Sequence, residues 1–168
     1  FETRLPWIAQ WGVHYHIGLD GFNVLLVLLT AFLGPLVVAG AFSAITKDVK
    51  LFYAMVFLIQ FTMLGTFLAQ DLFLFYVFWE AMLIPMFIII GVWGGPRRVY
   101  ASVKFFLFTF LGSVFMLIGL IYLYLKTGSF QLADLTAAPL DRTEQIWLFL
   151  AFLAAFAVKV PMFPVHTW

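Results

Sequence analysis

Five long apolar segments, separated by polar ones, dominate the pattern of hydrophobic and polar positions along the chain. Each runs for about 20 residues, the length of α-helix needed to cross the hydrocarbon core of a membrane. Strands of a membrane barrel would instead alternate between apolar and polar residues over about 10 positions. The pattern therefore predicts an all-α, polytopic membrane protein, a bundle of five transmembrane helices at approximately residues 22–45, 51–69, 72–93, 102–125 and 146–165.

Most links between these segments are short, so successive helices are expected to lie side by side and antiparallel. The longest link, residues 126–145, is predicted to hold a short surface helix near the sequence LADL. Within it, Asp141 and Glu144 have the spacing of a capping box that opens the last helix. Residues 1–21 contain two tryptophans and the alternating stretch VHYHIGL. They predict an interfacial, hairpin-like segment ahead of a membrane domain over residues 22–168.

Composition agrees with a membrane protein. The 168 residues are 65% hydrophobic and 10% charged, whereas soluble domains carry about 25% charged residues. The net charge of +1 gives no electrostatic reason to expect binding to nucleic acid. Cysteine is absent, which excludes disulfides and thiolate chemistry. The chain begins at Phe1 rather than methionine and stops at Trp168, so we expect it to be a piece of a longer polypeptide.

The distribution of basic residues predicts an orientation in the membrane. Positively charged loops favour the cytoplasmic side. One predicted side carries more of the basic residues: Lys47, Lys50, Arg97, Arg98 and Lys104. The other side carries three basic residues together with five acids. The first side is therefore expected to face the cytoplasm, and Phe1 the extracytoplasmic side.

Two charged residues, Glu80 and Lys159, lie deep within predicted transmembrane helices. At 1.5 Å per residue, Glu80 is about 12 Å and Lys159 about 20 Å from the same side of a core roughly 30 Å thick. Ionisable groups at such depth are costly and usually have a paired, functional role. When apart, a buried acid and base favour their neutral forms, and when together each stabilises the other's charge. This behaviour suits a proton relay, although an ion pair that only fixes helix packing is the alternative.

Prolines follow both of these charges. Pro161 and Pro164 come just after Lys159, and Pro85 comes five residues after Glu80. A proline lacks the backbone N–H of a helix, so the carbonyl of Ala157, four residues before Pro161, is expected to lose its partner. Irregular backbone at membrane depth occurs where it is buried in protein or lines a wet cavity. We therefore predict that the fifth helix is broken near Pro161.

Other polar residues have two interpretations each. His166 follows the last apolar segment and is either a proton carrier or a polar group at the end of the helix. Lys104 lies within a turn of a predicted helix start, where it either reaches the headgroups or belongs to a proton path. His14 and His16 have a spacing that can bind metal on a strand, but surface histidines are commoner, and no metal site is predicted.

Two stretches of the chain resemble a known family. FWEAMLIPMFIIIGVWGGPRRVYASVKFFLFT (residues 78–109) and AFAVKVPMFPVHTW (residues 155–168) resemble the M chains of bacterial NADH-quinone oxidoreductase, respiratory complex I. The mitochondrial counterpart is NADH dehydrogenase subunit 4. The resemblance runs from about Pro6 to the end, and the pattern WExxLIPM followed by KxPxxPxHxW is its most specific part.

The resemblance implies a fold and a site. The whole antiporter-like subunit would have about fourteen helices with two inverted repeats, and this chain would hold helices of the first repeat only. Glu80 and Lys159 match the proton-pumping pair of the family, and His166 matches a polar position near its cytoplasmic channel.

It also implies an activity, partners and a location: proton translocation coupled to NADH oxidation and quinone reduction elsewhere in the complex. No cofactor is expected in this chain, while NAD, FMN and iron–sulfur clusters belong to other subunits. Neighbouring antiporter-like chains and the lipid of a bacterial inner or equivalent energy-transducing membrane would surround it. Alternatives are a subunit of an Mrp-type Na⁺/H⁺ antiporter or membrane-bound hydrogenase, and a non-transporting scaffold.

Overall fold

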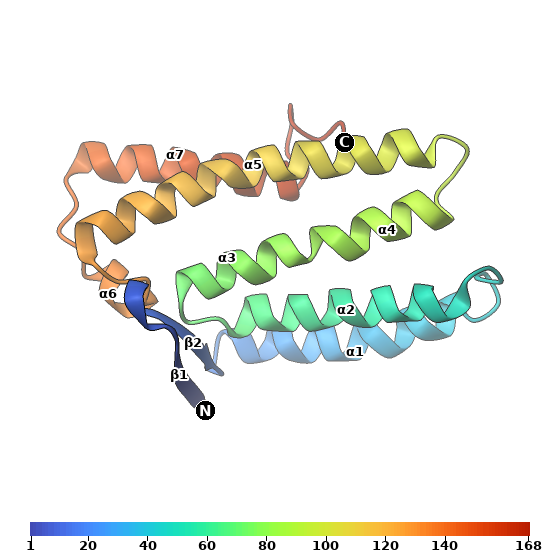
Figure 1. The fold of residues 1–168 in the computed structure, drawn as a ribbon, viewed down its shortest axis with the longest axis horizontal. Helices are drawn as coiled ribbons and strands as arrows, with labels where there is room; N and C mark the ends of the chain where they lie inside the picture. Colours follow the sequence, from blue (N-terminus) through green and yellow to red (C-terminus); the bar gives the residue numbers. More distant parts are fainter.

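The computed structural model describes residues 1–168 as a small β-hairpin followed by seven α-helices (Figure 1). The hairpin consists of antiparallel strands joined by a 3₁₀ turn at Ala9–Trp11. The strands and helices are β1 (Glu2–Ile8), β2 (Val13–Gly18), α1 (Asn23–Ala41), α2 (Val49–Leu68), α3 (Leu72–Ala81), α4 (Leu83–Trp93), α5 (Arg98–Thr127), α6 (Leu132–Thr136) and α7 (Arg142–Lys159).

The predicted all-α membrane fold is confirmed. Four helical segments are long and apolar enough to cross a membrane: Asn23–Ala41, Val49–Leu68, Leu72–Trp93 and Arg98–Thr127. The segment Leu72–Trp93 was predicted as one helix but consists of α3 and α4, which meet at Met82. The surface helix near LADL is α6, and Asp141 and Glu144 form the predicted capping box of α7.

The fifth predicted helix differs in its bounds. It was expected over residues 146–165, but α7 ends at Lys159 and the chain continues without helix. Pro161 is the physical reason, because it has no N–H to continue the helical ladder. The carbonyl of Ala157 loses its helical partner at Pro161, as expected, and accepts from the N–H of Met162 at 2.8 Å. The predicted break near Pro161 is therefore a helix end.

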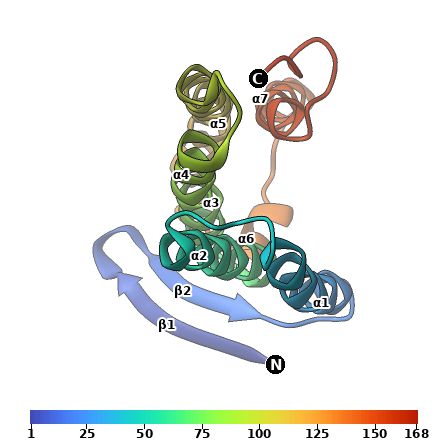
Figure 2. The same cartoon turned by 90° about the vertical axis from the view of Figure 1, so that its right-hand side faces the viewer.

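The helices pack in chain order. In the view along the helices (Figure 2), α2, the α3–α4 pair and α5 form a row, with α1 beside one end and α7 beside the other. The hairpin and α6 lie at one end of the helices, and the α1–α2 and α4–α5 links lie at the opposite end (Figure 1). The two groups of loops thus lie at opposite ends of the candidate membrane spans.

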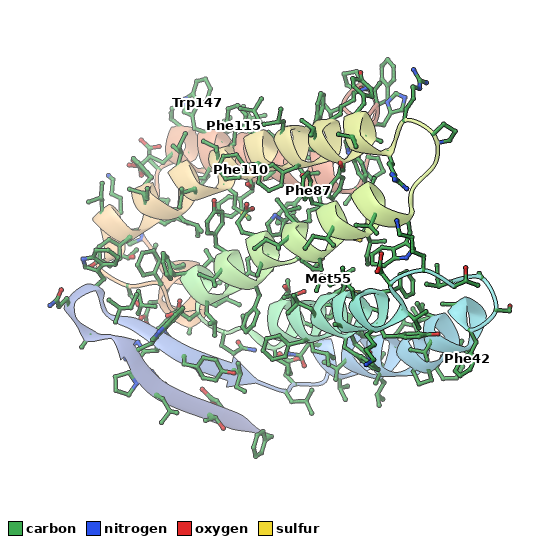
Figure 3. All side chains as sticks on the ribbon, turned by 45° about the vertical axis from the view of Figure 1, so that its right-hand side comes forward. Phe42, Met55, Phe87, Phe110, Phe115 and Trp147 are labelled. Atoms are coloured by element: carbon green, nitrogen blue, oxygen red, sulfur yellow. The ribbon has the colours of Figure 1, made fainter.

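Most apolar side chains of this arrangement face outward. Only 29 of the 168 residues are buried, which leaves a large apolar surface for lipid and neighbouring helices. Phe115 and Trp147 lie on the outer side of the α5–α7 pair (Figure 3), and they are 47% and 68% exposed. One small cluster of buried apolar side chains lies between α3, α5 and α7, formed around Met116, Leu120 and Ala155.

A glycine on α5 allows α7 to approach closely. A Cβ atom on Gly112 would lie 2.9 Å from the Cβ of Val158, closer than carbon atoms normally come. Small residues at helix contacts let membrane helices pack tightly without a hydrophobic driving force. Since Val158 directly precedes Lys159, this contact sets how far the end of α7 lies from α5.

A buried polar network attaches the hairpin to the helices. Asp71 is fully buried and caps α3 by accepting from the N–H groups of Phe73 and Leu74. Its second oxygen accepts from the His14 N–H at 3.1 Å and from the Gln131 side-chain amide at 2.7 Å. Gln131 also contacts the ring of His16, which pairs on its other side with Glu2. These contacts fix the start of α3 relative to the link between α5 and α6.

We predict that Gly112→Ala destabilises the protein. The added methyl group overpacks the contact with Val158, and such changes cost about 1–3 kcal/mol. Gly40→Ala in α1 is the matched control, because nothing lies within 4 Å of a Cβ atom there. Thermal unfolding of the two purified variants should show a lower midpoint for Gly112→Ala only. Equal midpoints would contradict the tight α5–α7 contact.

A second prediction concerns the join between α5 and α7. The Glu144 carboxylate pairs with Lys126 at 2.5 Å, accepts from the Tyr122 hydroxyl at 2.5 Å, and accepts from the backbone of Asp141 at 3.0 Å. These partners, Lys126 first, lower the pKa of Glu144 to about 2. Because the pKa is lowered on folding, the stabilisation is complete above the ordinary value of about 4.3 and is lost as pH falls toward 2.

The unfolding midpoints of wild type and Glu144→Gln should therefore differ most near neutral pH and converge below about pH 4. Asp134→Asn, at an exposed site on α6, is the control. A difference that stays constant from neutral pH to pH 3 would refute this account of the join.

Candidate functional site

Glu80 lies in the last turn of α3, next to the interruption of the third apolar segment. α3 ends at Ala81 and α4 starts at Leu83, with Met82 between them in a right-handed helical backbone conformation. Pro85 in α4 has no N–H, so the carbonyl of Ala81 cannot receive its usual helical bond. The sequence thus interrupts the helix within a few residues of its one acidic side chain.

Lys159 is the last residue of α7, and its side chain reaches across to this interruption. Its Nζ donates a hydrogen bond to the backbone carbonyl of Trp79 at 2.8 Å. The same nitrogen lies 4.1 Å from the centre of the Trp79 ring, within the range of a cation–π interaction. Trp79, the residue before Glu80, therefore holds the Lys159 ammonium through both its backbone carbonyl and its ring.

The structure brings Glu80 and Lys159 together without closing an ion pair between them. The ion pair that it does form is Lys126–Glu144, and His16 contacts Glu2. Lys159 is nevertheless close to Glu80, because its ammonium is bonded to the backbone of the preceding residue, Trp79. The Oε1 atom of Glu80 is buried and has no hydrogen-bond partner. An unpartnered buried carboxyl oxygen is costly, and it is relieved by a proton on the group, by water, or by movement of the ammonium toward it.

Two further polar groups adjoin Glu80. The hydroxyl of Ser113 on α5 and the phenol of Tyr76 on α3 lie near its carboxyl group. Ser113 is only 2% exposed and donates to the carbonyl of Phe110 at 2.8 Å. Sequence reasoning missed both residues and also Trp79. The four-residue spacing of Tyr76 and Glu80 on one helix face is a signal for Tyr76, whereas the contact to Ser113 depends on how α3 packs on α5.

The other candidate residues lie in the segment after α7. His166 is exposed, and its ring lies 5.8 Å from that of Phe163. The Nζ of Lys104 donates to the carbonyl of Thr167 at 2.7 Å, so Lys104 attaches this segment to α5. No hydrogen bond joins His166 or Lys104 to Glu80 or Lys159. Pro161 and Pro164 lie in the irregular backbone that follows the helix end.

Metal ligation finds no support in this arrangement. No three His, Cys, Asp or Glu side chains come together in a way that would hold a metal ion. His14 and His16 instead belong to the network that attaches the hairpin to Asp71 and Gln131. The candidate site itself consists of an acid, a base and nearby hydroxyl groups.

Fold and site define a class of protein. Apolar helices with interruptions at membrane depth, and with charged side chains at those interruptions, are typical of polytopic transport proteins. The family described as NADH:quinone oxidoreductase/Mrp antiporter, transmembrane, matches residues 69–168. The chain belongs to this family, and the resemblance inferred from residues 78–109 and 155–168 is confirmed.

The similarity of the chain to individual proteins agrees with this family assignment. The chain is 46% identical to NADH-quinone oxidoreductase subunit M of Rhodobacter capsulatus, over 100% of this chain and 35% of that protein. It is also similar to a chain of respiratory complex I from Thermus thermophilus, with 37% identity, a TM-score of 0.84, and coverage of 99% of this chain and 35% of that one.

An antiporter complex shares the fold. A chain of the Mrp complex from Dietzia has a TM-score of 0.92 and 21% identity, over 100% of this chain and 19% of that chain. At this identity the match shows the fold alone. The chain spans about a third of the length of the curated relatives that it matches.

Proposed function

We propose that this chain is part of the antiporter-like, proton-translocating membrane subunit of NADH-quinone oxidoreductase. Its identity to a relative of that name supports the assignment, as does membership of the family. The observation that carries the mechanism is the position of the Lys159 ammonium on the carbonyl of Trp79, beside the unpartnered buried oxygen of Glu80. Glu80 and Lys159 are the proposed proton-transfer residues.

The geometry supports a switch between two arrangements. In the arrangement described here, the Trp79 carbonyl and ring hold the ammonium, and Glu80 forms no ion pair with it. If α7 or its end moves, Lys159 either closes on the free oxygen of Glu80 or withdraws from it. An ammonium that loses its counter-charge in an apolar site releases its proton more readily. Lys159 would then pass a proton to water or to a neighbouring group and take up another when the pair closes again.

The energy for this movement would come from other subunits. NADH oxidation and quinone reduction, with NAD, FMN and iron–sulfur clusters, belong to them in this proposal. Neighbouring antiporter-like chains in a bacterial inner or equivalent membrane would transmit the change. The hairpin would face the extracytoplasmic side, and the α1–α2 and α4–α5 links, with their basic residues, would face the cytoplasm. His166 and Lys104 remain candidates for the proton path on that side.

The second candidate function is a subunit of an Mrp-type antiporter, since its fold matches and the family includes both. Identity favours the first proposal, with 46% to the oxidoreductase subunit against 21% to the Mrp chain. Partners that copurify with the full-length protein would separate the two, because only the oxidoreductase brings NADH-oxidising subunits. The same purification would reveal the partners of a membrane-bound hydrogenase.

We expect Glu80→Gln and Lys159→Met each to reduce NADH-driven proton pumping by tenfold or more, since losing a positioned acid or base costs about 10²–10⁴ in rate. Proton uptake by vesicles containing the assembled complex measures this. Lys50→Gln, in the first turn of α2, is the control. Wild-type pumping in both site variants would rule out the assignment. Loss of the complex on a native gel together with pumping would support the scaffold alternative.

A further inference from the structure

A basic pocket lies at the end of the helices opposite the hairpin. It has a volume of about 450 Å³ and is formed by the α4–α5 link, the first turns of α5 and the segment after α7. Three cationic side chains line it, those of Arg97, Arg98 and Lys104, and no acidic side chain does. Lys104 is also a candidate for the proposed proton path, but Arg97 and Arg98 have no part in that proton transfer.

The donors of these side chains are mostly unused. Arg98 donates one N–H to the carbonyl of Val92 at 2.9 Å, and Lys104 donates one to the carbonyl of Thr167 at 2.7 Å. Arg97 makes no side-chain hydrogen bond, and none of the three forms an ion pair. A guanidinium has five N–H donors and an ammonium has three. Two of the cations are thus held in place while most of the donors stay available to an anion.

The surroundings of the pocket match the boundary between membrane and water. Tyr100 and Trp168 line it, and such aromatic residues are enriched at membrane interfaces. Next to the pocket, one stripe of α5 is apolar and faces outward: Val99, Val103 and Leu107 are 68%, 44% and 59% exposed. Their spacing of four residues places them in a line along the helix. A ligand with an anionic head and apolar chains would fit both the basic pocket and the apolar stripe.

We infer that this pocket binds the phosphate headgroup of an anionic phospholipid, with an acyl chain lying along the stripe of Val99, Val103 and Leu107. Arginine binds phosphate oxygens through pairs of N–H donors, and basic pockets at the ends of membrane helices are suited to lipid headgroups. Free phosphate has the same anionic oxygens as a phospholipid headgroup, but it would leave the adjoining apolar stripe uncovered. A lipid with a net negative charge suits the excess of cations better than a zwitterionic one.

The test uses the full-length protein in its assembled complex, incubated with vesicles of equal parts phosphatidylglycerol and phosphatidylcholine. Lipid retained after repurification is measured by mass spectrometry. Wild type should retain phosphatidylglycerol in several-fold excess. Arg97→Gln should weaken its retention about fivefold, as expected for one charge, and should not disturb the fold because the Arg97 side chain makes no hydrogen bond and its backbone bond to Ala101 is kept. Arg97→Lys should restore most of it.

Controls separate this site from general attraction. Arg142→Gln, an exposed cation at the other end of the molecule, should leave retention unchanged. Inorganic phosphate should compete poorly, since it lacks the acyl chains. The inference is overturned if both lipids are retained equally, if Arg97→Gln and Arg142→Gln have the same effect, or if inorganic phosphate displaces phosphatidylglycerol completely.

Discussion

The hydrogen bond from the Lys159 ammonium to the carbonyl of Trp79 is the interaction around which this structure is organised. A charge at membrane depth is tolerated only where protein groups replace the solvation that water would give. An intact helix offers no free carbonyl for that purpose, because its own N–H groups occupy them. The interruption of the third apolar segment at Met82 and the end of α7 at Lys159 together place a cation beside irregular backbone.

Other contacts fix the positions of α3 and α7, the helices that carry Glu80 and Lys159, relative to the rest of the fold. Asp71 caps α3 and receives bonds from the hairpin and from Gln131, so the helix carrying Glu80 is anchored at its start. Gly112 lets α7 approach α5 just before Lys159. The opposite end of α7 is held to α5 through Glu144 and Lys126. Because α3 and α7 are each attached at their starts, a small displacement of the parts farther along them changes the distance between Glu80 and Lys159.

Much of this fold is predictable from sequence, because a membrane imposes helices of known length. The helices, the hairpin, the surface helix α6 and the capping box of Asp141 follow from local patterns. Depth along the helices also singled out Glu80 and Lys159. Hydropathy alone continued the last helix to residue 165, whereas the proline pattern predicted a break near Pro161, and α7 ends at Lys159.

Contacts between distant segments were beyond such reasoning. The role of the Trp79 carbonyl depends on how α7 crosses α3, and the approach of Ser113 depends on how α5 packs. The link from His16 through Gln131 to Asp71 joins three parts of the chain that no local motif connects. Sequence could say that Glu80 and Lys159 share a depth, but not that they lie together without closing an ion pair.

The central claim is that Glu80 and Lys159 act as one unit in moving protons, and a double-mutant cycle tests it most directly. Proton pumping per NADH would be measured in vesicles for Glu80→Gln, Lys159→Met and the double variant, with assembly of each complex verified. If the residues act as a unit, the double variant pumps no worse than the more impaired single variant, because the second change removes nothing further. Losses that multiply in the double variant would show that the two residues act independently and would contradict the account.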